Sequence, residues 1–231
     1  MVGGFRLFAF LFIAQCLFAS SVFASVRVLV LGDSISAAYG IDKSEGWVAL
    51  LQTRLDSQCS SAEGVGIQNS GGQAPDIKVM NASVSGETTH GGKVRLPDLL
   101  SEHKPRLVII ELGGNDGLRG LSPVVMQKNL ASMIELSHKV GAKVVLLGIL
   151  IPPNYGIVYQ TLFEQAIANV AESTQVPFVK FFLEGIGGRA ELMQDDGVHP
   201  TAAAQVILLD NAWVALAEPL QTFCEPSFTQ P

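Results

Sequence analysis

The chain has 231 residues, a formal net charge of −6 and a hydrophobic content of 48%. Charged residues make up 16% of the sequence and form no long acidic or basic run, which excludes the clustered Lys and Arg of a nucleic-acid-binding surface. This composition is typical of one well-packed domain, an enzyme or a binding module, of the roughly 100–200 residues usual for globular domains.

Residues 1–24 have the pattern of a secretory signal peptide. Arg6, the only charge in this segment, precedes an apolar run over residues 7–19, and a Val and an Ala stand at −3 and −1 of a site suited to signal peptidase. The run of about 13 residues is shorter than the roughly 20 that span a bilayer, so an uncleaved anchor is the weaker alternative. We therefore expect cleavage near Ala24, a mature domain over residues 25–231 that is periplasmic or secreted, and no stable membrane span.

Five short apolar segments, rich in β-branched residues and spread evenly along the chain, are predicted strands. They lie at residues 26–31, 77–80, 107–112, 143–149 and 178–182. Their nearly continuous apolar character indicates strands buried on both faces, as in a parallel sheet covered by helices.

Helical patterns alternate with these strands. Apolar residues at helical spacing predict helices over residues 45–55, 94–103, 123–140, 158–173 and 200–220. Ser122 and Pro123 are typical of a helix start, as N-cap and first helical residue. This alternation predicts an α/β fold, a three-layer α/β/α sandwich with right-handed crossovers. The polar residues 57–76 are predicted to form a surface loop.

Polar, glycine-containing turns follow three of these strands, and a fourth such turn precedes the last helix. The turns are Gly32–Ser36, Asn81–Thr88, Gly113–Gly117 and Asp196–Pro200. Ligands of parallel α/β sheets bind beyond the carboxyl ends of the strands, so these turns stand where a site is expected. Each alone has an ordinary explanation as a turn, a loop or a helix cap. Their combination in this order predicts an active site.

Ser34 in the first turn, with Asp196 and His199 in the last, has the residue types that nucleophilic catalysis needs. A serine hydroxyl attacks a carbonyl carbon when a base takes its proton, and histidine is the side chain suited to that task near neutral pH. The histidine in turn needs a carboxylate to fix its tautomer, and Asp196 stands three residues before His199. We predict Ser34 as the nucleophile and Asp196 with His199 as its base.

Acyl transfer also places negative charge on the carbonyl oxygen, which requires hydrogen-bond donors. The candidates are the backbone N–H groups of Ser34 and Gly86 and the side-chain amide of Asn115. Glycine permits close approach of the backbone, and asparagine donates without adding a charge. Asp33 is predicted to brace the nucleophile turn by hydrogen bonds, and Glu111 to have a structural role.

At these residues the chain resembles the SGNH (GDSL) hydrolases. The resemblance extends over nearly all of residues 25–231 and rests on Gly32-Asp33-Ser34, Gly86, Gly-Gly-Asn115-Asp and Asp196-x-x-His199. It implies a flavodoxin-like sheet of five parallel strands. It also implies no metal and no organic cofactor, and a broad hydrolysis of acyl esters and thioesters.

The resemblance also implies a role for each matched residue. Ser34 matches the nucleophile, Gly86 and Asn115 match the oxyanion residues, and Asp196 and His199 match the acid–base pair. The family's mobile loop beside the oxyanion asparagine corresponds to a substrate-binding loop of Gly117, Leu118, Arg119, Gly120 and Leu121.

Cys59 and Cys224 are the cysteines that remain after residue 24. An even pair in an exported protein suggests a disulfide, and two separate buried thiols are the alternative. If the sheet is flavodoxin-like, as the resemblance implies, the helices before both cysteines run toward the amino ends of the strands. This topology favours a Cys59–Cys224 disulfide.

The leading function is an acyl hydrolase with esterase, arylesterase, thioesterase or lysophospholipase activity. Its expected partners are small-molecule acyl esters, thioesters or lysophospholipids, and the protein is expected to be a monomer or a weak oligomer. A carbohydrate O-acetylesterase and a non-catalytic binding module on the same scaffold are the alternatives. The sequence does not give the preferred acyl chain, because loops form the walls of the pocket.

Overall fold

The computed structural model describes residues 25–60 and 76–224. The predicted signal peptide, most of the polar insertion and the residues after 224 lie outside the described residues. The described chain forms a five-stranded parallel sheet in the order β2-β1-β3-β4-β5. The strands are β1 (Val26–Gly32), β2 (Ile77–Asn81), β3 (Leu107–Glu111), β4 (Lys143–Leu147) and β5 (Phe178–Val179).

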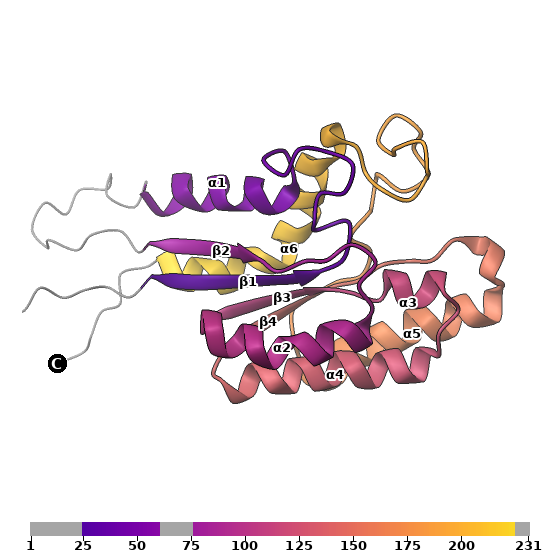
Figure 1. Ribbon diagram of the computed structural model, residues 1–231, viewed down its shortest axis with the longest axis horizontal. Helices are drawn as coiled ribbons and strands as arrows, with labels where there is room; N and C mark the ends of the chain where they lie inside the picture. Colours follow the sequence, from indigo (N-terminus) through magenta and orange to yellow (C-terminus); the bar gives the residue numbers. More distant parts are fainter. Residues whose placement is uncertain (1–24, 61–75, 225–231) are drawn as a thin grey trace, which may run out of the picture.

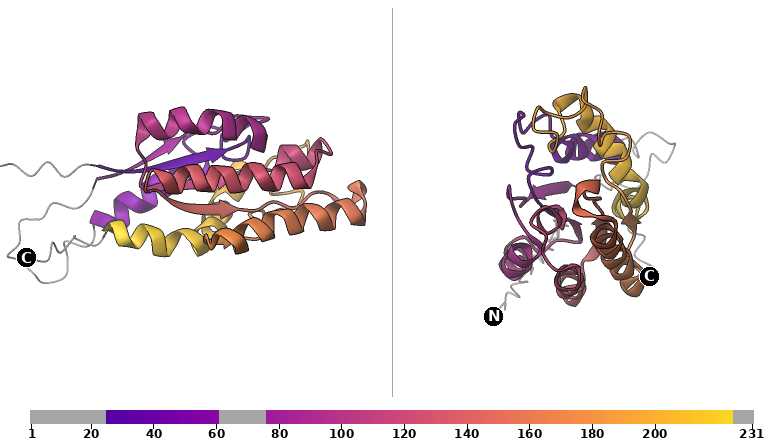
Figure 2. Two further views of the ribbon diagram at one scale, coloured as in Figure 1. Left: turned by 90° about the horizontal axis from the view of Figure 1, so that it is seen from below. Right: turned by 90° about the vertical axis from the view of Figure 1, so that its right-hand side faces the viewer.

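Helices cover both faces of this sheet (Figure 1). They are α1 (Trp47–Ser60), α2 (Thr89–His103), α3 (Gly114–Leu118), α4 (Pro123–Lys139), α5 (Ile157–Thr174) and α6 (Gln205–Cys224), with short 3-10 turns η2 (Pro153–Tyr155) and η3 (Ala202–Ala204). α1 packs against α6 on one face, whereas α2, α4 and α5 lie side by side on the other (Figure 2). The predicted three-layer α/β/α sandwich and its flavodoxin-like strand order are confirmed.

The central strands β1 and β3 form the core because both of their faces are covered. Residues 28–31 and 107–110 are apolar and fully buried. Burying one such side chain contributes about 1.5–3 kcal/mol. Gly32 and Glu111 lie directly opposite each other at the carboxyl ends of these strands. The segments that carry the predicted site therefore leave the sheet at the same edge.

α4 starts where Ser122 and Pro123 predict it, but the cap differs from the expectation. Ser122 has the extended backbone of an N-cap, and its carbonyl oxygen accepts the N–H groups of Val125 and Met126 at 3.0 and 3.1 Å. Its side chain makes no capping hydrogen bond. The start of α4 therefore depends on backbone bonds and on the proline rather than on the Ser122 hydroxyl.

α2 begins at Thr89 and not near residue 94, as the apolar pattern predicted. The hydroxyl of Thr88 accepts the N–H of Gly91 at 3.3 Å, and the carboxylate of Asp116 accepts the N–H of Thr89 at 2.8 Å. The adjacent glycines have low helix propensity and hid this first turn. Gly92 has a packing reason, since a Cβ there would lie 2.4 Å from the Leu112 side chain.

Other predicted boundaries were also wrong: α6 begins at Gln205 rather than at residue 200, and β4 ends at Leu147 rather than at residue 149. The fifth strand, predicted over residues 178–182, contains only Phe178–Val179, and Phe182 is fully buried with its ring 5.3 Å from that of Trp47. The apolar character of Phe182 therefore reflects its packing against α1 and does not indicate a longer strand. α1 continues to Ser60, so the first residues of the predicted loop 57–76 are helical.

The last turn of α1 contains Cys59, which is joined to Cys224 at the end of α6 by a disulfide. The bond connects residues 165 positions apart. It ties together the two helices that form one layer of the sandwich, at the amino ends of the strands.

Candidate active site

Ser34 lies in the turn that follows β1, nearly buried, with its hydroxyl directed at a histidine. Ser34 Oγ is 2.8 Å from Nε2 of His199. The turn depends on the glycine before it, since a Cβ at Gly32 would lie 2.6 Å from the Ser36 Cβ and 2.9 Å from a Glu111 carboxyl oxygen. Asp33 Oδ1 accepts the N–H of Ile35 at 3.0 Å and fixes the turn further.

Asp196 holds His199 from the opposite side. Asp196 Oδ2 is 2.6 Å from Nδ1 of His199, while Oδ1 accepts the backbone N–H groups of His199 and Val198 at 3.0 and 2.9 Å. These hydrogen bonds lower the pKa of Asp196 from 3.8 to about 2, the His199 backbone bond contributing most. Because the ionised carboxylate attracts the Nδ1 proton, Nε2 is left as an acceptor for the Ser34 hydroxyl.

The segment that carries His199 is attached to the segment that follows the nucleophile turn. The side-chain amide of Gln194 donates to the carbonyl oxygens of Tyr39 and Pro200 at 2.8 and 3.0 Å. The ring of Tyr39 lies 4.5 Å from that of His199. These contacts fix the long connection between β5 and α6, which brings the histidine to the sheet edge from beside it.

Three hydrogen-bond donors beside Ser34 are unused by the protein. Within residues 25–60 and 76–224, the backbone N–H groups of Ser34 and Gly86 have no acceptor. The amide of Asn115 donates one N–H to Asp33 Oδ2 at 3.1 Å, and its second N–H has no partner in the same part of the chain. Gly86 has a φ of +79°, a left-handed conformation that glycine adopts without strain.

Several bonds bring these donors to one place. The N–H of Val84 donates to the Gly32 carbonyl at 3.1 Å, so the segment after β2 lies along the nucleophile turn. The guanidinium of Arg119 donates to the carbonyl of Gly86 at 2.9 Å and joins this segment to the end of α3. Donors so arranged can stabilise negative charge on an oxygen bound next to Ser34.

Asp116 and Thr89 support the site, although the sequence did not assign them a role. Both side chains are buried, and Asp116 accepts the N–H of Thr89 at 2.8 Å and its hydroxyl at 2.6 Å. Asn129 on α4 donates to the same hydroxyl at 3.2 Å. Asp116 therefore fastens the start of α2 to α3, which carries Asn115. In the sequence, the position of Asp116 directly after Asn115 was the signal that could have identified its role.

The predicted substrate-binding loop divides into two parts. Gly117 and Leu118 belong to α3, because the predicted polar turn at 113–117 is largely a short helix, and Arg119, Gly120 and Leu121 follow it. The apolar side chains of Leu118 and Leu121 are exposed.

Two tyrosines that the sequence analysis missed hold this loop to the start of α5. The hydroxyl of Tyr155 donates to the carbonyl of Leu118 at 2.8 Å, and that of Tyr159 donates to Leu121 at 2.6 Å. In the sequence, the Pro-Pro-Asn-Tyr-Gly turn was the signal that could have identified Tyr155.

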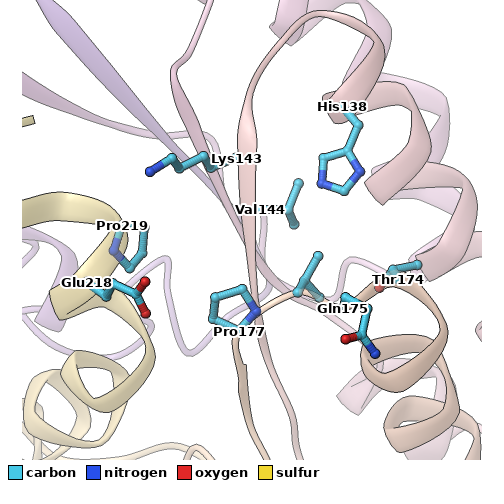
Figure 3. Close-up of a pocket in the computed structure, with 9 residues that line it drawn as sticks. His138, Lys143, Val144, Thr174, Gln175, Pro177, Glu218 and Pro219 are labelled. Atoms are coloured by element: carbon cyan, nitrogen blue, oxygen red, sulfur yellow. The ribbon is translucent and has the colours of Figure 1, made fainter. Parts of the chain in front are cut away.

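The hollow drawn in Figure 3, about 250 Å³ in volume, does not belong to this site. It is lined by Lys143, which begins β4, and by Thr174 and Glu218 near the ends of α5 and α6. It therefore lies at the amino ends of the strands, whereas Ser34 lies at their carboxyl ends. In the described part of the chain, no group of three or more His, Cys, Asp or Glu could hold a metal ion. No helix among those described residues is long and apolar enough to cross a membrane.

Comparison with known proteins identifies the family of this chain and several similar proteins. A family model described as GDSL-like Lipase/Acylhydrolase matches residues 30–207. The chain belongs to the GDSL-like lipase/acylhydrolase family. Esterase TesA of Pseudomonas aeruginosa is 52% identical over 193 residues, which cover 84% of this chain and 89% of that protein.

Two more distant relatives agree with this assignment. Thioesterase 1/protease 1/lysophospholipase L1 of Escherichia coli is 37% identical over 206 residues, 89% of this chain and 88% of that protein. The solved esterase EstA from Pseudoalteromonas, inhibited by monoethylphosphonate, is 38% identical and has a TM-score of 0.74, covering 84% of this chain and 98% of its own. The chain is therefore an enzyme of the hydrolase class, an acylhydrolase of this family.

Proposed function

We propose that this protein is an exported serine acyl hydrolase that cleaves esters, thioesters and lysophospholipids through an acyl intermediate on Ser34. The observation that carries the proposal is the hydrogen-bonded series from Asp196 through His199 to the Ser34 hydroxyl, next to three unused donors. A non-catalytic binding module has no need for an activated hydroxyl beside unused donors.

In the first half of the reaction, Ser34 Oγ attacks the acyl carbonyl carbon while its proton passes to Nε2 of His199. The carbonyl oxygen becomes an oxyanion and accepts hydrogen bonds from the N–H groups of Ser34 and Gly86 and from the free N–H of Asn115. The tetrahedral intermediate then breaks the bond to the leaving group. The alcohol or thiol takes the proton from His199 and departs, and the acyl group stays on Ser34.

In the second half, a water molecule attacks the acyl-serine carbonyl and gives one proton to His199. The same donors hold the second oxyanion. The bond to Ser34 Oγ then breaks, Ser34 regains the proton from His199, and the carboxylic acid leaves. Asp196 stays ionised throughout, orients the ring and stabilises the imidazolium. The relative esterase EstA is inhibited by monoethylphosphonate. The tetrahedral phosphorus of a phosphonate resembles the tetrahedral carbon of these two intermediates.

The side chains around the site favour an apolar acyl group. Five exposed apolar side chains belong to the segments that surround Ser34: Tyr39, Val84, Leu118, Leu121 and Val198. Such side chains gain free energy by covering a fatty acyl chain. These positions support a lipid or aryl ester as the substrate rather than an acetylated carbohydrate.

A substrate panel on the wild type and on Ser34→Ala tests this function. The panel contains p-nitrophenyl esters from acetate to palmitate, a fatty acyl thioester and a lysophospholipid. We expect wild-type activity on medium or long acyl chains and on the thioester, with parallel loss of all activities in Ser34→Ala. Activity confined to acetate would support the O-acetylesterase instead, and normal turnover by Ser34→Ala would contradict the serine mechanism.

Export is the second part of the proposal and is supported by the pattern of residues 1–24. Cell fractionation after expression in a Gram-negative host, followed by intact mass measurement, tests it. We expect the mature protein in the periplasm with Ser25 as its first residue. Full-length protein retained in the cytoplasm would contradict export.

A further inference from the structure

Two buried carboxyl groups lie beneath the nucleophile turn. Glu111 ends β3 and Asp33 precedes Ser34, with exposures of 2% and 3%. The backbone N–H of Asp33 donates to a carboxyl oxygen of Glu111 at 3.3 Å, so the two acidic residues lie close together. Neither group has a role in the proton transfers of the proposed reaction, so their close burial needs another explanation.

Glu111 is enclosed by donors from the turn itself. Its Oε2 atom accepts the hydroxyl of Ser36 at 2.8 Å and the backbone N–H of Asp33 at 3.3 Å. The indole N–H of Trp47, on α1, donates to the same Ser36 hydroxyl at 3.2 Å. The contacts of Glu111 therefore converge on the residues on either side of Ser34.

Asp33 has donors on both of its carboxyl oxygens. Oδ1 accepts the N–H of Ile35 at 3.0 Å, and Oδ2 accepts one N–H of the Asn115 amide at 3.1 Å. A carboxyl group that accepts at both oxygens is suited to be the ionised member of the pair. Its bond to Asn115 fixes the direction of the second N–H of that amide.

The pair has no cationic partner of its own. Across residues 25–60 and 76–224, no Lys or Arg forms an ion pair with either carboxyl group, and the neighbouring base that acts on Asp33 is His199. Burial raises the pKa of Asp33 to about 6, and burial together with the Asp33 charge raises the pKa of Glu111 well above its usual range. Two ionised carboxylates so close together would repel each other, which favours a state in which one of them keeps its proton.

We propose that Glu111 is a positioning residue for the oxyanion site: it keeps a proton and donates it in a hydrogen bond to Asp33, which remains a carboxylate and orients the Asn115 amide. This inference rests on the oxyanion role proposed for Asn115. No proton leaves the pair during turnover. The neutral acid supplies the donor that a second carboxylate could not, and Asn115 thereby points its free N–H at the substrate oxygen.

Three variants separate this role from simple packing. In Glu111→Gln the amide donates to Asp33 and its oxygen accepts from Ser36, so the hydrogen bonds are kept without a titrating proton. Glu111→Leu removes them at similar volume. Ser36→Ala is the matched control, because it removes one contact of Glu111 and leaves the bond to Asp33.

Steady-state kinetics at pH 7 give the first readout. We expect kcat of Glu111→Gln within about threefold of wild type. Glu111→Leu should lose about 100-fold in kcat with little change in KM, the effect of a misplaced oxyanion donor. Ser36→Ala should lose less than about tenfold. A Glu111→Gln variant as impaired as Glu111→Leu, or a Glu111→Leu variant within threefold of wild type, would overturn the proposal.

The pH profile gives a second readout that a packing role would not change. Of the titratable groups around the pair, Asp33 acts on Glu111 and His199 acts on Asp33. On the alkaline side, loss of the Glu111 proton should lower kcat in wild type. Glu111→Gln should lack this alkaline decline. The same decline in Glu111→Gln would contradict the proposal, and this result holds even if Glu111→Leu fails to fold.

Failure of the proposed function would look different. If Ser34 were not the nucleophile, Ser34→Ala would keep its activity, whatever the Glu111 variants do. If only the positioning role were wrong, Ser34→Ala would be inactive and the Glu111 variants would fail in one of the ways described above.

Discussion

The amide of Asn115 donates one N–H to Asp33, and its second N–H has no partner among residues 25–60 and 76–224. Removing this amide takes away one of the three donors proposed for the oxyanion. It also removes the hydrogen bond from Asn115 to Oδ2 of Asp33. Because that donor acts on charge that develops in the transition state, the loss should fall on kcat rather than on KM.

For Asn115→Ala we expect a fall in kcat of about 10²–10³, with KM changed by less than a few-fold. Asn115→Asp should be at least as impaired, because it adds a second charge next to Asp33. Both are measured with a p-nitrophenyl ester, alongside thermal unfolding to establish that the fold is intact. A loss confined to KM would contradict an oxyanion role.

Asp196 and His199 form the other residue-scale unit. Replacing Asp196 by Asn should lower kcat by about 10⁴, since the imidazole is no longer held in the tautomer that leaves Nε2 free. KM for a short ester should change little. Retention of more than a tenth of wild-type kcat would show that the carboxylate does not orient the base.

The lowered pKa of Asp196 also predicts how stability depends on pH. A carboxyl group whose pKa falls from 3.8 to about 2 on folding stabilises the folded protein above pH 3.8, and this contribution disappears as the pH approaches 2. Asp196→Asn should therefore be less stable than wild type at pH 7, and the difference should vanish near pH 2. Urea unfolding at both pH values measures it. A difference that grows toward pH 2 would contradict the assignment.

At the scale of elements, the disulfide joins α1 to α6 across one face of the sheet. In the chain-entropy model, closing a loop of this length stabilises the folded state by about 5 kcal/mol. The double variant Cys59→Ser/Cys224→Ser should lose a large part of that free energy of unfolding. Its activity at 25 °C should remain near wild type, because the bond lies at the end of the sheet opposite Ser34.

Urea unfolding of the double variant, with the reduced wild type as control, checks this prediction. Both proteins should unfold at similarly lower urea concentrations than the oxidised wild type. A reduced wild type that keeps the stability of the oxidised protein would contradict a stabilising role for the bond.

The elements that the sequence predicted best are those determined by their own residues. β1 and β3 could be predicted as strands because every residue at 28–31 and 107–110 is apolar. α4 could be predicted as a helix because Met126, Leu130 and Met133 recur at helical spacing. The first turn of α2 was missed because its stabilising partner, Asp116, is distant in sequence. The end of β5 was misplaced because Phe182 is apolar for contact with α1.

The same distinction applies to the site. Ser34, Gly86, Asn115, Asp196 and His199 could be predicted as site residues because each stands in a recognisable turn at a strand end or helix start. Glu111, Tyr155 and Tyr159 have their partners on other elements, and Glu111 meets Ser36 across 75 positions of the sequence. The sequence indicated a turn around Tyr155 and a structural role for Glu111, but it could not identify their distant partners.

At the scale of the whole molecule, the parallel sheet assembles the site from distant segments. Ser34 and His199 are 165 positions apart and meet because the connection after β5 returns to the carboxyl edge. The reactivity of Ser34 should therefore exist only in the folded protein. An unfolded chain has the same serine without its base and without the oxyanion donors.

Labelling with a fluorophosphonate, followed by peptide mapping by mass spectrometry, tests the central claim most directly. The account predicts one adduct per native molecule, located on Ser34, with activity lost in proportion to labelling. It predicts no adduct in protein unfolded in urea or in Ser34→Ala, and strongly slowed labelling in His199→Ala. An adduct on another residue, or full inhibition with Ser34 unmodified, would contradict Ser34 as the nucleophile.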